Sequence, residues 1–500
     1  MNALSMTAIG PLTPRVVAFL HRLLPILPAE PEPHMVGGFV RDALLGRATR
    51  DMDITVGADA VAVARRMADA LGGAFVLLDE PRKVARVVVQ EGGETWLVDV
   101  ASLQGDRMED LARRDFTIDA MSVPIKALVM DEWQGHILDP FGGRTDLESG
   151  VIRAVSSRVF QEDGLRLLRA VRLAASLGFD IEAGTQDMIR RDAGALAGVS
   201  AERVRDEFLD ILASGKAMRH VYLLDDLTLL CRVVPELEEG RGLTQPKEHY
   251  WDVLRHNIET VGVVEGLLER TWEPEWVLEA IPWDAAQAAR FEEVVGEGHT
   301  RGTFLKLAGL LHDIAKPATR TVDEEGRIRF KGHQSQGATT AQAVLGRLRL
   351  SRRTIDMIAA QIEHHLRPAQ MSQEAELATP KAVYRYFRSA GDVAIDILYL
   401  NLADYLAARG PRLEREEWAA YTAKVRHIMV TGAAQEQPIQ AQPLVDGHAL
   451  MGYFHLPPGP LVGRLLEAIR EAQATGEVAT REAALALVKQ MLSTEKGESV

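Results

Sequence analysis

Apolar and polar residues alternate with two different periods along the chain, and the change falls near Phe160. Before it, short β-rich apolar runs are separated by turns that contain glycine pairs, which predicts a small α/β domain over residues 29–150. After it, apolar positions recur with a helical period to about residue 430, which predicts a long helical region. The predicted strands lie at Val84–Gln90, Thr95–Ala101, Thr117–Val123 and His136–Asp139.

Capping residues and composition mark further boundaries. Gly178 ends one predicted helix, and Ser200 is a good N-cap for the next, Ala201–Ala213. The Gln-, Ala- and Pro-rich segment Gly432–Pro443 predicts a linker, and Leu444–Val500 predicts a small helical module. The fold class is therefore multidomain α+β, with a small α/β head that contains a short mixed sheet, followed by helical parts.

Composition narrows the class of protein. A chain of 500 residues is too long for one core, and 47% apolar and 26% charged residues are ordinary for a globular protein. The single cysteine, Cys231, excludes an intramolecular disulfide and a cysteine-built zinc site, and it fits a reducing cytoplasm. No apolar run approaches the length of a membrane span. A net charge of −14 argues against nucleic-acid binding through bulk charge, although local arginine clusters leave a basic groove open.

The most informative stretch is residues 35–53, M-V-G-G-F-V-R-D-A-L-L-G-R-A-T-R-D-M-D. Gly37 and Gly38 open a predicted helix, Phe39–Leu45, and their missing side chains let the backbone approach an anion. Asp51 and Asp53 lie two apart in a predicted strand, so both carboxylates project from one face, where they suit Mg²⁺ with substrate phosphates. Each motif alone is usually a turn or a solvated strand end, but together they predict nucleotidyl transfer.

Three further groups each allow a functional and a structural interpretation. Asp99 lies on a buried-looking strand, where it is either a third acid near the metals or a hydrogen-bonded structural residue. Arg114 and Asp115 either bind the triphosphate and orient the ribose or form a surface charge cluster. Asp163 and Arg166 share a helix face at i, i+3, where they either read a base edge or form an ordinary ion pair.

Taken in order, these segments resemble the class II tRNA nucleotidyltransferase and poly(A) polymerase family. The resemblance covers residues 34–240 strongly and most of the remainder more loosely. The family pattern is G-G-x-V-R-D, D-x-D, R-R-D-F-T-I-N-A, E-D-x-x-R and E-R-x-R-x-E. It is present here at Gly37–Asp42, Asp51/Asp53, Arg113–Ala120, Glu162–Arg166 and Glu202–Glu207.

The resemblance implies a role for each matched residue. Asp51 and Asp53, with Asp99 as a candidate third acid, would be catalytic and hold two Mg²⁺ ions that activate the RNA 3′-hydroxyl and stabilise the leaving pyrophosphate. Asp163 and Arg166 would pair with the incoming CTP or ATP base without a nucleic-acid template. The other nucleotide-binding residues would be Gly37, Gly38, Arg41, Asp42, Arg114, Asp115 and Arg169.

Three departures from the family pattern are present. Asp119 stands where the family usually has Asn, and Gly164 replaces the usual Pro. Only residues 100–110 separate Asp99 from the segment Leu111-Ala-Arg113, where CCA-adding members often carry a longer loop associated with the switch from CTP to ATP. Members that add only CC resemble this shortened version. We expect addition of C, C and A to the tRNA 3′ end, with CC-only addition and then poly(A) polymerase as alternatives.

A second set of residues lies further along the chain, with histidines and acids in the order H…HD…H…HH…D: His256, His312-Asp313, His333, His364-His365 and Asp404. This order resembles the HD-domain metal-dependent phosphohydrolases. The resemblance implies a transition metal, Mn²⁺, Ni²⁺ or Fe²⁺, with His333 and His365 available for a second metal or a substrate phosphate. The alternatives are a degenerate, purely structural HD fold, an HD phosphohydrolase as the main activity, and an RNA-binding protein without catalysis. The core ligands would be His256, His312, Asp313 and Asp404.

These resemblances predict the order of the domains. An N-terminal helical segment (1–28) precedes the nucleotidyltransferase head (29–150), a neck with the base-reading helix (151–235), an HD domain (236–430), and the linker and helical tail (431–500). The tail resembles the C-terminal module of the same enzymes, which implies a grip on the tRNA. The expected partners are the tRNA 3′ end, CTP and ATP. We expect no membrane partner and a location in the cytoplasm. The sequence leaves the oligomeric state open.

Overall fold

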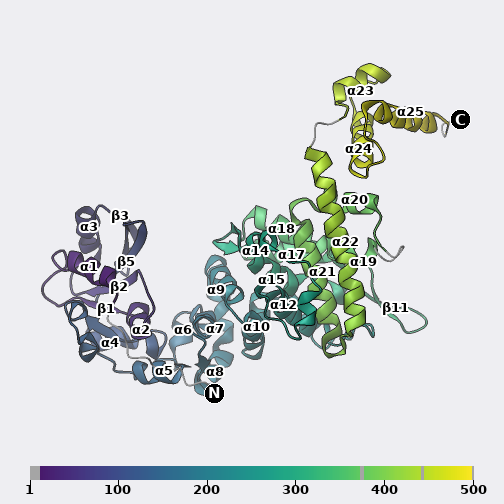
Figure 1. Ribbon diagram of the computed structural model, residues 1–500. Coiled ribbons are helices and arrows are strands. Elements are labelled where there is room, and N and C mark those ends of the chain that lie inside the picture. Colours follow the sequence, from purple (N-terminus) through teal and green to yellow (C-terminus); the bar gives the residue numbers. More distant parts are fainter. Residues whose placement is uncertain (1–11, 372–376, 441–443, 498–500) are drawn as a thin grey trace. The chain divides into compact units, whose positions relative to one another are not determined.

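The computed structural model describes residues 12–371, 377–440 and 444–497 (Figure 1). The chain divides into two compact units, one of Met1–Ile211 with Leu223–Val233 and one of Leu212–Tyr222 with Val234–Val500. The predicted N-terminal segment lies partly outside the described residues. Its described part forms α1 (Pro14–Leu23), which Thr13 caps and which buries Phe19 and Leu20. Proline at the first helical position suits this start, because its missing N–H needs no partner there.

The first unit contains a six-stranded mixed sheet in the order β3-β4-β5-β2-β1-β6. Strands β2 (Asp51–Val56) and β5 (Glu94–Ser102) are parallel, and the other neighbouring strands are antiparallel. Alternating buried valines of β4 and β5 form much of its core. The predicted head with a short mixed sheet is thus confirmed. The other strands are β1 (His34–Val36), β3 (Ala74–Asp79), β4 (Val84–Glu91) and β6 (Ser122–Pro124), and the accompanying helices are α2 (Gly38–Leu44), α3 (Ala60–Leu71) and α4 (Arg107–Ala112).

Two of the predicted strands form only in part. Residues 117–123 make a 3-10 turn, η1 (Thr117–Asp119), before β6. Within residues 136–139, only Leu138 pairs, through an isolated bridge to Ser122. The Asp139 carboxylate accepts hydrogen bonds from the backbone N–H groups of Gly143 (2.7 Å) and Arg144 (2.9 Å), which favours a turn over a continued strand.

Helices continue the first unit after the sheet. The predicted helix end at Gly178 is confirmed, because α7 (Arg166–Leu177) stops there with φ +74° at the glycine. The predicted helix Ala201–Ala213 is α9. Further elements of this unit include α5 (Gly143–Ser149), β7 (Val151–Ile152), α6 (Val159–Glu162), β8 (Asp180–Ile181), α8 (Ala183–Asp192), η4 (Ala193–Gly198) and α11 (Leu230–Val233). Helix α10 (Ala217–Asp226) belongs to both units, because residues 217–222 lie in the second and residues 223–226 in the first.

The second unit is mainly helical. Helix α12 (Val253–Glu269) packs against α15 (Arg301–Leu311) and α21 (Ala394–Arg409), and α15 is buried along its whole length. Helix α17 (His333–Arg347) packs against α18 (Arg352–His364). Within the described part of the chain, none of the helices combines the length and the apolar character that a membrane span needs. The other elements are α13 (Trp276–Glu279), α14 (Ala285–Glu292), β9 (Val294–Gly296), β10 (His299–Thr300), α16 (Lys316–Thr319), β11 (Arg320–Val322), β12 (Ile328–Phe330), α19 (Arg367–Met371), α20 (Pro380–Ala390) and α22 (Arg415–Gln440).

The segment predicted as a linker differs from that expectation. Helix α22 continues through residues 432–440, and residues 441–443 lie outside the described residues. Ala433, Ala434 and Gln435 are strong helix formers, which explains the continuation. Gly432 is required by packing, because a β-carbon there would collide with the ring of Phe387.

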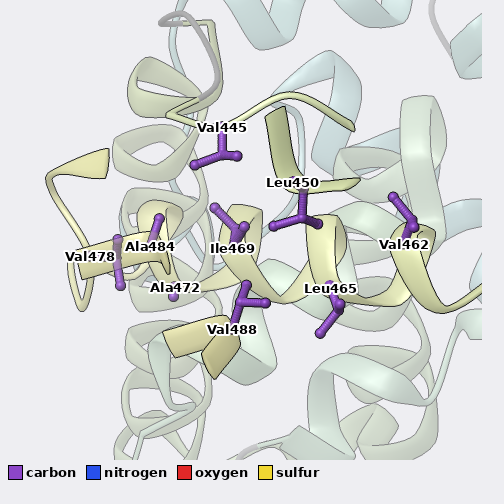
Figure 2. Close-up of a cluster of buried hydrophobic side chains, with 9 residues drawn as sticks. All are labelled: Val445, Leu450, Val462, Leu465, Ile469, Ala472, Val478, Ala484 and Val488. Carbon is purple, nitrogen blue, oxygen red and sulfur yellow. The ribbon is translucent and has the colours of Figure 1, made fainter. Parts of the chain in front are cut away.

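The predicted C-terminal helical module has its own hydrophobic core (Figure 2). It consists of α23 (Gly447–Phe454), α24 (Pro460–Ala474) and α25 (Arg481–Gly497). Figure 2 shows side chains of all three helices and of the connecting segments converging on one cluster. The cluster consists of Val445, Leu450, Val462, Leu465, Ile469, Ala472, Val478, Ala484 and Val488.

Candidate active site

Three carboxylates lie on one face of the head sheet. Asp53 stands opposite Asp99 in the parallel β2–β5 register, and Asp51 is two residues before Asp53 on the same face. Burial raises the pKa of Asp53 to about 6, with Arg114 opposing the effect and Asp51 and Asp99 adding to it. Burial and the Asp99 charge also raise the pKa of Asp51. Mutually repelling carboxylates of this kind favour a divalent cation between them.

Arg86 of β4 distinguishes Asp99 from the other two acids. Its Nε and Nη2 donate to the two oxygens of Asp99 at 2.7 and 2.8 Å. Among the described residues, Asp51 and Asp53 have no such ion pair. Arg86 was not predicted from the sequence, because it is only one charged residue in an apolar strand, and its partner depends on the β4–β5 register. A bidentate arginine occupies both oxygens of Asp99, so Asp51 and Asp53 remain as the more available acids.

The glycine pair brings the acids close to arginine side chains. Gly37 has φ +70°, and a β-carbon there would lie 3.0 Å from Arg114 Nη1 and 3.1 Å from Asp53 Oδ2. A β-carbon on Gly38 would lie 3.2 Å from Arg41 Nη2. Glycine is therefore favoured at Gly37 by its positive φ, while at Gly38 a β-carbon would press against the end of the Arg41 side chain. Without β-carbons, the two arginines and Asp53 all reach the space beside the pair.

Asp119, which departs from the family pattern, binds Arg41. Arg41 Nη1 donates to Asp119 Oδ1 at 2.7 Å, while Nε and Nη2 donate to Asp42 at 2.9 and 3.1 Å. Burial raises the pKa of Asp119 to about 6, although Arg41 opposes the effect. The predicted nucleotide-binding residues Arg41 and Asp42 are thus paired with each other and with Asp119.

Asp115 and Arg169 were predicted separately, and the structure joins them. Arg169 Nη1 lies 3.0 Å from Asp115 Oδ2, and Glu207 lies 3.5 Å from the Nε of the same arginine. Burial alone would raise the pKa of Asp115, but Arg169 outweighs it and lowers the pKa. Arg169 begins the second turn of α7, so its ion pair with the buried Asp115 holds that helix against the arginine motif.

The expectation that Asp163 and Arg166 share one helix face is wrong. Asp163 has an extended backbone between α6 and α7, and α7 begins only at Arg166. Asp163 Oδ2 accepts from Arg203 Nη2 at 2.9 Å, which lowers the pKa of Asp163 against the effect of burial. Arg166 donates to the carbonyls of Arg113 (2.7 Å) and Val159 (3.2 Å). Each residue is therefore fixed by its own partners, and Arg203, inside the matched Glu202–Glu207 motif, is a contributor that was not predicted.

The residues predicted as HD ligands meet in the buried centre of the second unit. The Nε2 atoms of His256 and His312 lie 3.2 Å apart. His256 Nε2 is 3.1 Å from Asp404 Oδ1 and 3.4 Å from Asp313 Oδ2, and His312 Nε2 is 3.2 Å from the same Asp313 oxygen. Two imidazoles and two carboxylates at these distances are a donor set that suits a transition metal.

Backbone carbonyls orient three of the histidine rings. Each carbonyl accepts a hydrogen bond from Nδ1, so a proton lies on Nδ1, and in the neutral imidazole Nε2 is the nitrogen that carries the lone pair. This is the tautomer that binds a metal through Nε2. The contacts join His312 to Gly309 (2.8 Å), His333 to Phe330 (2.6 Å) and His365 to Ile362 (2.7 Å).

A second group of donors shares Asp313. His333 Nε2 lies 3.3 Å and His365 Nε2 lies 4.0 Å from Asp313 Oδ1. Among the described residues, Asp313 Oδ1 and His333 Nε2 are buried without a hydrogen bond, although buried polar atoms normally have one. A metal ion would satisfy both atoms, so the residues fit the predicted second metal or substrate group.

His249 and Lys316 were not predicted and lie at the same centre. His249 joins His256, Asp313 and Asp404 as a group that could hold a metal ion. Lys316 Nζ lies 2.5 Å from Asp313 Oδ2 and 3.3 Å from His249 Nε2. His249 is an isolated histidine in a loop, so only the tertiary structure identifies it.

Burial and neighbouring charges shift the pKa values of three histidines in this centre. Burial alone would lower the pKa of His312, but Asp313 and Asp404 outweigh it and raise the pKa to about 10. Burial lowers the pKa of His365 to about 4, with the His312 charge adding to it. Burial and Lys316 lower the pKa of His249 to about 3. Without a metal, the positive charge of His312 therefore balances the carboxylates of Asp313 and Asp404, a role that a bound metal cation would take over.

Family models match three parts of the chain. The Poly A polymerase head domain matches residues 34–153, the probable RNA and SrmB-binding site of polymerase A matches residues 178–240, and the HD domain matches residues 284–409. His256 lies outside the last span, although the structure places it among the HD residues. Fold and site together define a nucleotidyltransferase head joined to an HD domain.

Comparison with whole proteins identifies the family. The chain is 34% identical to the A-adding tRNA nucleotidyltransferase of Deinococcus radiodurans, over 95% of this chain and 98% of the relative. It is 34% identical to the CC-adding tRNA nucleotidyltransferase of Thermus thermophilus, over 91% and 92% of the two chains. The structure of the Thermotoga maritima CCA-adding enzyme complexed with tRNA has the same fold, with a TM-score of 0.62 at 23% identity over 97% of each chain. The chain belongs to the tRNA nucleotidyltransferase family, which confirms the resemblance.

Proposed function

We propose that this enzyme extends the 3′ end of tRNA with C, C and A, taken from CTP and ATP. The observation that carries the proposal is the Asp51 and Asp53 pair on β2, with Gly37 and Arg114 beside Asp53. Mg²⁺ at these carboxylates would supply charge stabilisation and an activated hydroxyl for in-line displacement. Arg114 would contribute positive charge for the triphosphate.

Base selection is proposed for Asp163 and Arg166. Asp163 is held by Arg203, and Arg166 is held by two backbone carbonyls. Side chains that are fixed before the nucleotide arrives can present donors and acceptors to a base edge without a nucleic-acid template. Asp115 and Arg169 bind each other, so their proposed contribution is to position α7 beside the arginine motif.

Addition of CC alone is the second candidate, and one observation favours it. Strand β5 ends at Ser102 and α4 begins at Arg107, so only residues 103–106 connect them. Asp106 and Glu109 form a capping box, which fixes the start of α4. This connection is the place at which the family's longer loop would have to lie.

Extension of three tRNA substrates separates the possibilities. The substrates end before the CCA sequence, after the first C and after the second C, and each is incubated with CTP, ATP or both. Complete CCA addition predicts C on the first two substrates and A on the third. A CC-only enzyme leaves the third substrate unextended, an A-adding enzyme extends only the third, and a poly(A) polymerase adds a run of A to any of them.

We further propose that the HD centre hydrolyses phosphate esters with a bound Mn²⁺, Ni²⁺ or Fe²⁺. The proposal is supported by the converging nitrogen and oxygen donors of His256, His312, Asp313 and Asp404. Its test is metal removal by a chelator, reloading with each ion separately, and hydrolysis of 2′,3′-cyclic nucleotides by wild type and His312→Ala. A structural HD fold predicts no hydrolysis under any loading.

The proposed location is the bacterial cytoplasm. The two full-length relatives are bacterial tRNA nucleotidyltransferases, and tRNA maturation draws on cytoplasmic CTP and ATP. Separation of cell extract into membrane and soluble fractions, followed by immunodetection of the protein, tests this location.

A further inference from the structure

Arg41 lies at the glycine pair, but carboxylates already bind it. Three of its nitrogen atoms donate to Asp42 and Asp119 at 2.7–3.1 Å. The arginine side chain is only 13% exposed. Its Nη2 lies 3.2 Å from the β-carbon position of Gly38, so the guanidinium faces the space proposed for the triphosphate. A triphosphate that approaches this arginine meets a cation whose charge two carboxylates already balance.

The two carboxylates differ in what they can do. Asp42 is the next residue after Arg41 on α2, so the two residues move together if that helix shifts. Asp119 belongs to a separate element, the η1 turn, and is 78 residues from Arg41 in sequence. Asp119 is 8% exposed, so water screens its charge poorly. Its contact with Arg41 is therefore the pairing that can compete with a ligand.

We propose that Asp119 sets the nucleotide affinity of the head by competing with the triphosphate for Arg41. The inference rests on the proposed nucleotidyl transfer. Asn at this position would keep a hydrogen-bond acceptor for Arg41 and remove the negative charge. Arg41 would then turn more of its charge toward the triphosphate, and the negative charge nearest to the phosphates would be lower by one. Asp119 thus acts through Arg41 as a positioning residue that weakens nucleotide binding.

The test compares Asp119→Asn, Arg41→Gln and the double variant with wild type. CTP incorporation into tRNA that lacks CCA gives KM and kcat, and equilibrium binding of CTP without tRNA gives Kd. We expect Asp119→Asn to lower KM and Kd about tenfold, with kcat within about twofold of wild type. Arg41→Gln is expected to raise both constants, and in that background Asp119→Asn is expected to change them little.

Asp146→Asn is the matched control. Asp146 is another buried carboxylate of the first unit, which pairs with Arg153 at 3.0 Å and accepts a hydrogen bond from Thr117 Oγ1 of η1 at 2.7 Å. Its substitution therefore disturbs the turn that carries Asp119 but leaves the contact between Arg41 and Asp119 itself. Its substitution is expected to lower the melting temperature without lowering the KM for CTP. The proposal is overturned if Asp119→Asn leaves KM unchanged or raises it, if its gain persists with Arg41→Gln, or if Asp146→Asn shows the same gain. CTP binding is measured without turnover, so a failure of nucleotidyl transfer remains distinguishable from a failure of this inference.

Discussion

At the residue scale, the candidate site acids of the first unit differ in whether an arginine binds them. Asp99 binds Arg86, Asp115 binds Arg169, and Asp163 binds Arg203. These three acids can therefore position other groups of the site. Asp51 and Asp53 have raised pKa values and no ion pair among the described residues. Carboxylates that are partly buried and mutually repelled carry a cost that bound metal relieves. The two acids of β2 are therefore the expected metal ligands.

The raised pKa of Asp53 predicts the pH dependence of Mg²⁺ binding. A folded pKa of about 6 against an ordinary value of 3.8 means that the metal-free folded state holds more protons than the unfolded state between these pH values. Stability without metal therefore falls as pH rises from about 4 to 6. Because Mg²⁺ competes with this proton, the Mg²⁺ concentration for half-maximal incorporation is expected to rise up to about tenfold per pH unit below 6 and to level off above it. Mg²⁺ titrations at several pH values measure this, and an equal requirement at pH 5 and pH 8 contradicts the assignment.

At the element scale, the break between α6 and α7 places the base-reading residues. Gly164 lies in this break, and a β-carbon there would collide with the carbonyl oxygen of Ala195 in η4. The glycine that departs from the family pattern is thus explained by close backbone packing. The extended Asp163 and the first residue of α7 owe their relative positions to this contact.

Gly164→Ala tests the role of this packing. The new β-carbon is expected to push η4 and the break apart and to destabilise the protein by ~1–3 kcal/mol, as overpacking of a filled site does. Gly194→Ala is the matched control in η4 itself, because a β-carbon there meets no atom within 4 Å. Urea unfolding measures both. Equal stability of the two variants would show that Ala195 does not constrain Gly164.

The sequence predicted local features better than long-range partners. The acid pair on β2, the end of α7 at Gly178 and the bounds of α9 follow from local periodicity and capping, and the structure has them. Arg86, Arg203 and His249 were missed because their roles depend on strand register or on packing between distant helices. Helix α22 was missed in part because Pro438 and glutamines suggested a linker, while its alanines and packing favour a helix.

At the scale of the whole molecule, the two candidate centres belong to different compact units. The Asp51/Asp53 pair lies in the first unit, and the HD donors lie in the second. Each donor set is completed by side chains of its own unit. The two chemistries are therefore expected to respond independently to substitution.

Asp313→Asn tests this independence. Loss of the carboxylate that both HD donor groups share is expected to lower bound transition metal and hydrolysis by at least about tenfold. Nucleotide incorporation is expected to stay within about twofold of wild type. Metal analysis by mass spectrometry and the two activity assays provide the comparison, and a parallel loss of both activities would contradict two separate centres.

Transfer of labelled CMP from CTP to tRNA that lacks CCA, by wild type and Asp51→Ala, tests the central claim most directly. Asp69→Ala, an exposed acid on α3, is the control, and circular dichroism confirms that all three proteins are folded. We predict extension and pyrophosphate release by wild type and Asp69→Ala, and a loss of at least about a thousandfold with Asp51→Ala. Extension by folded Asp51→Ala at the wild-type rate, or none by wild type, would contradict nucleotidyl transfer at these acids.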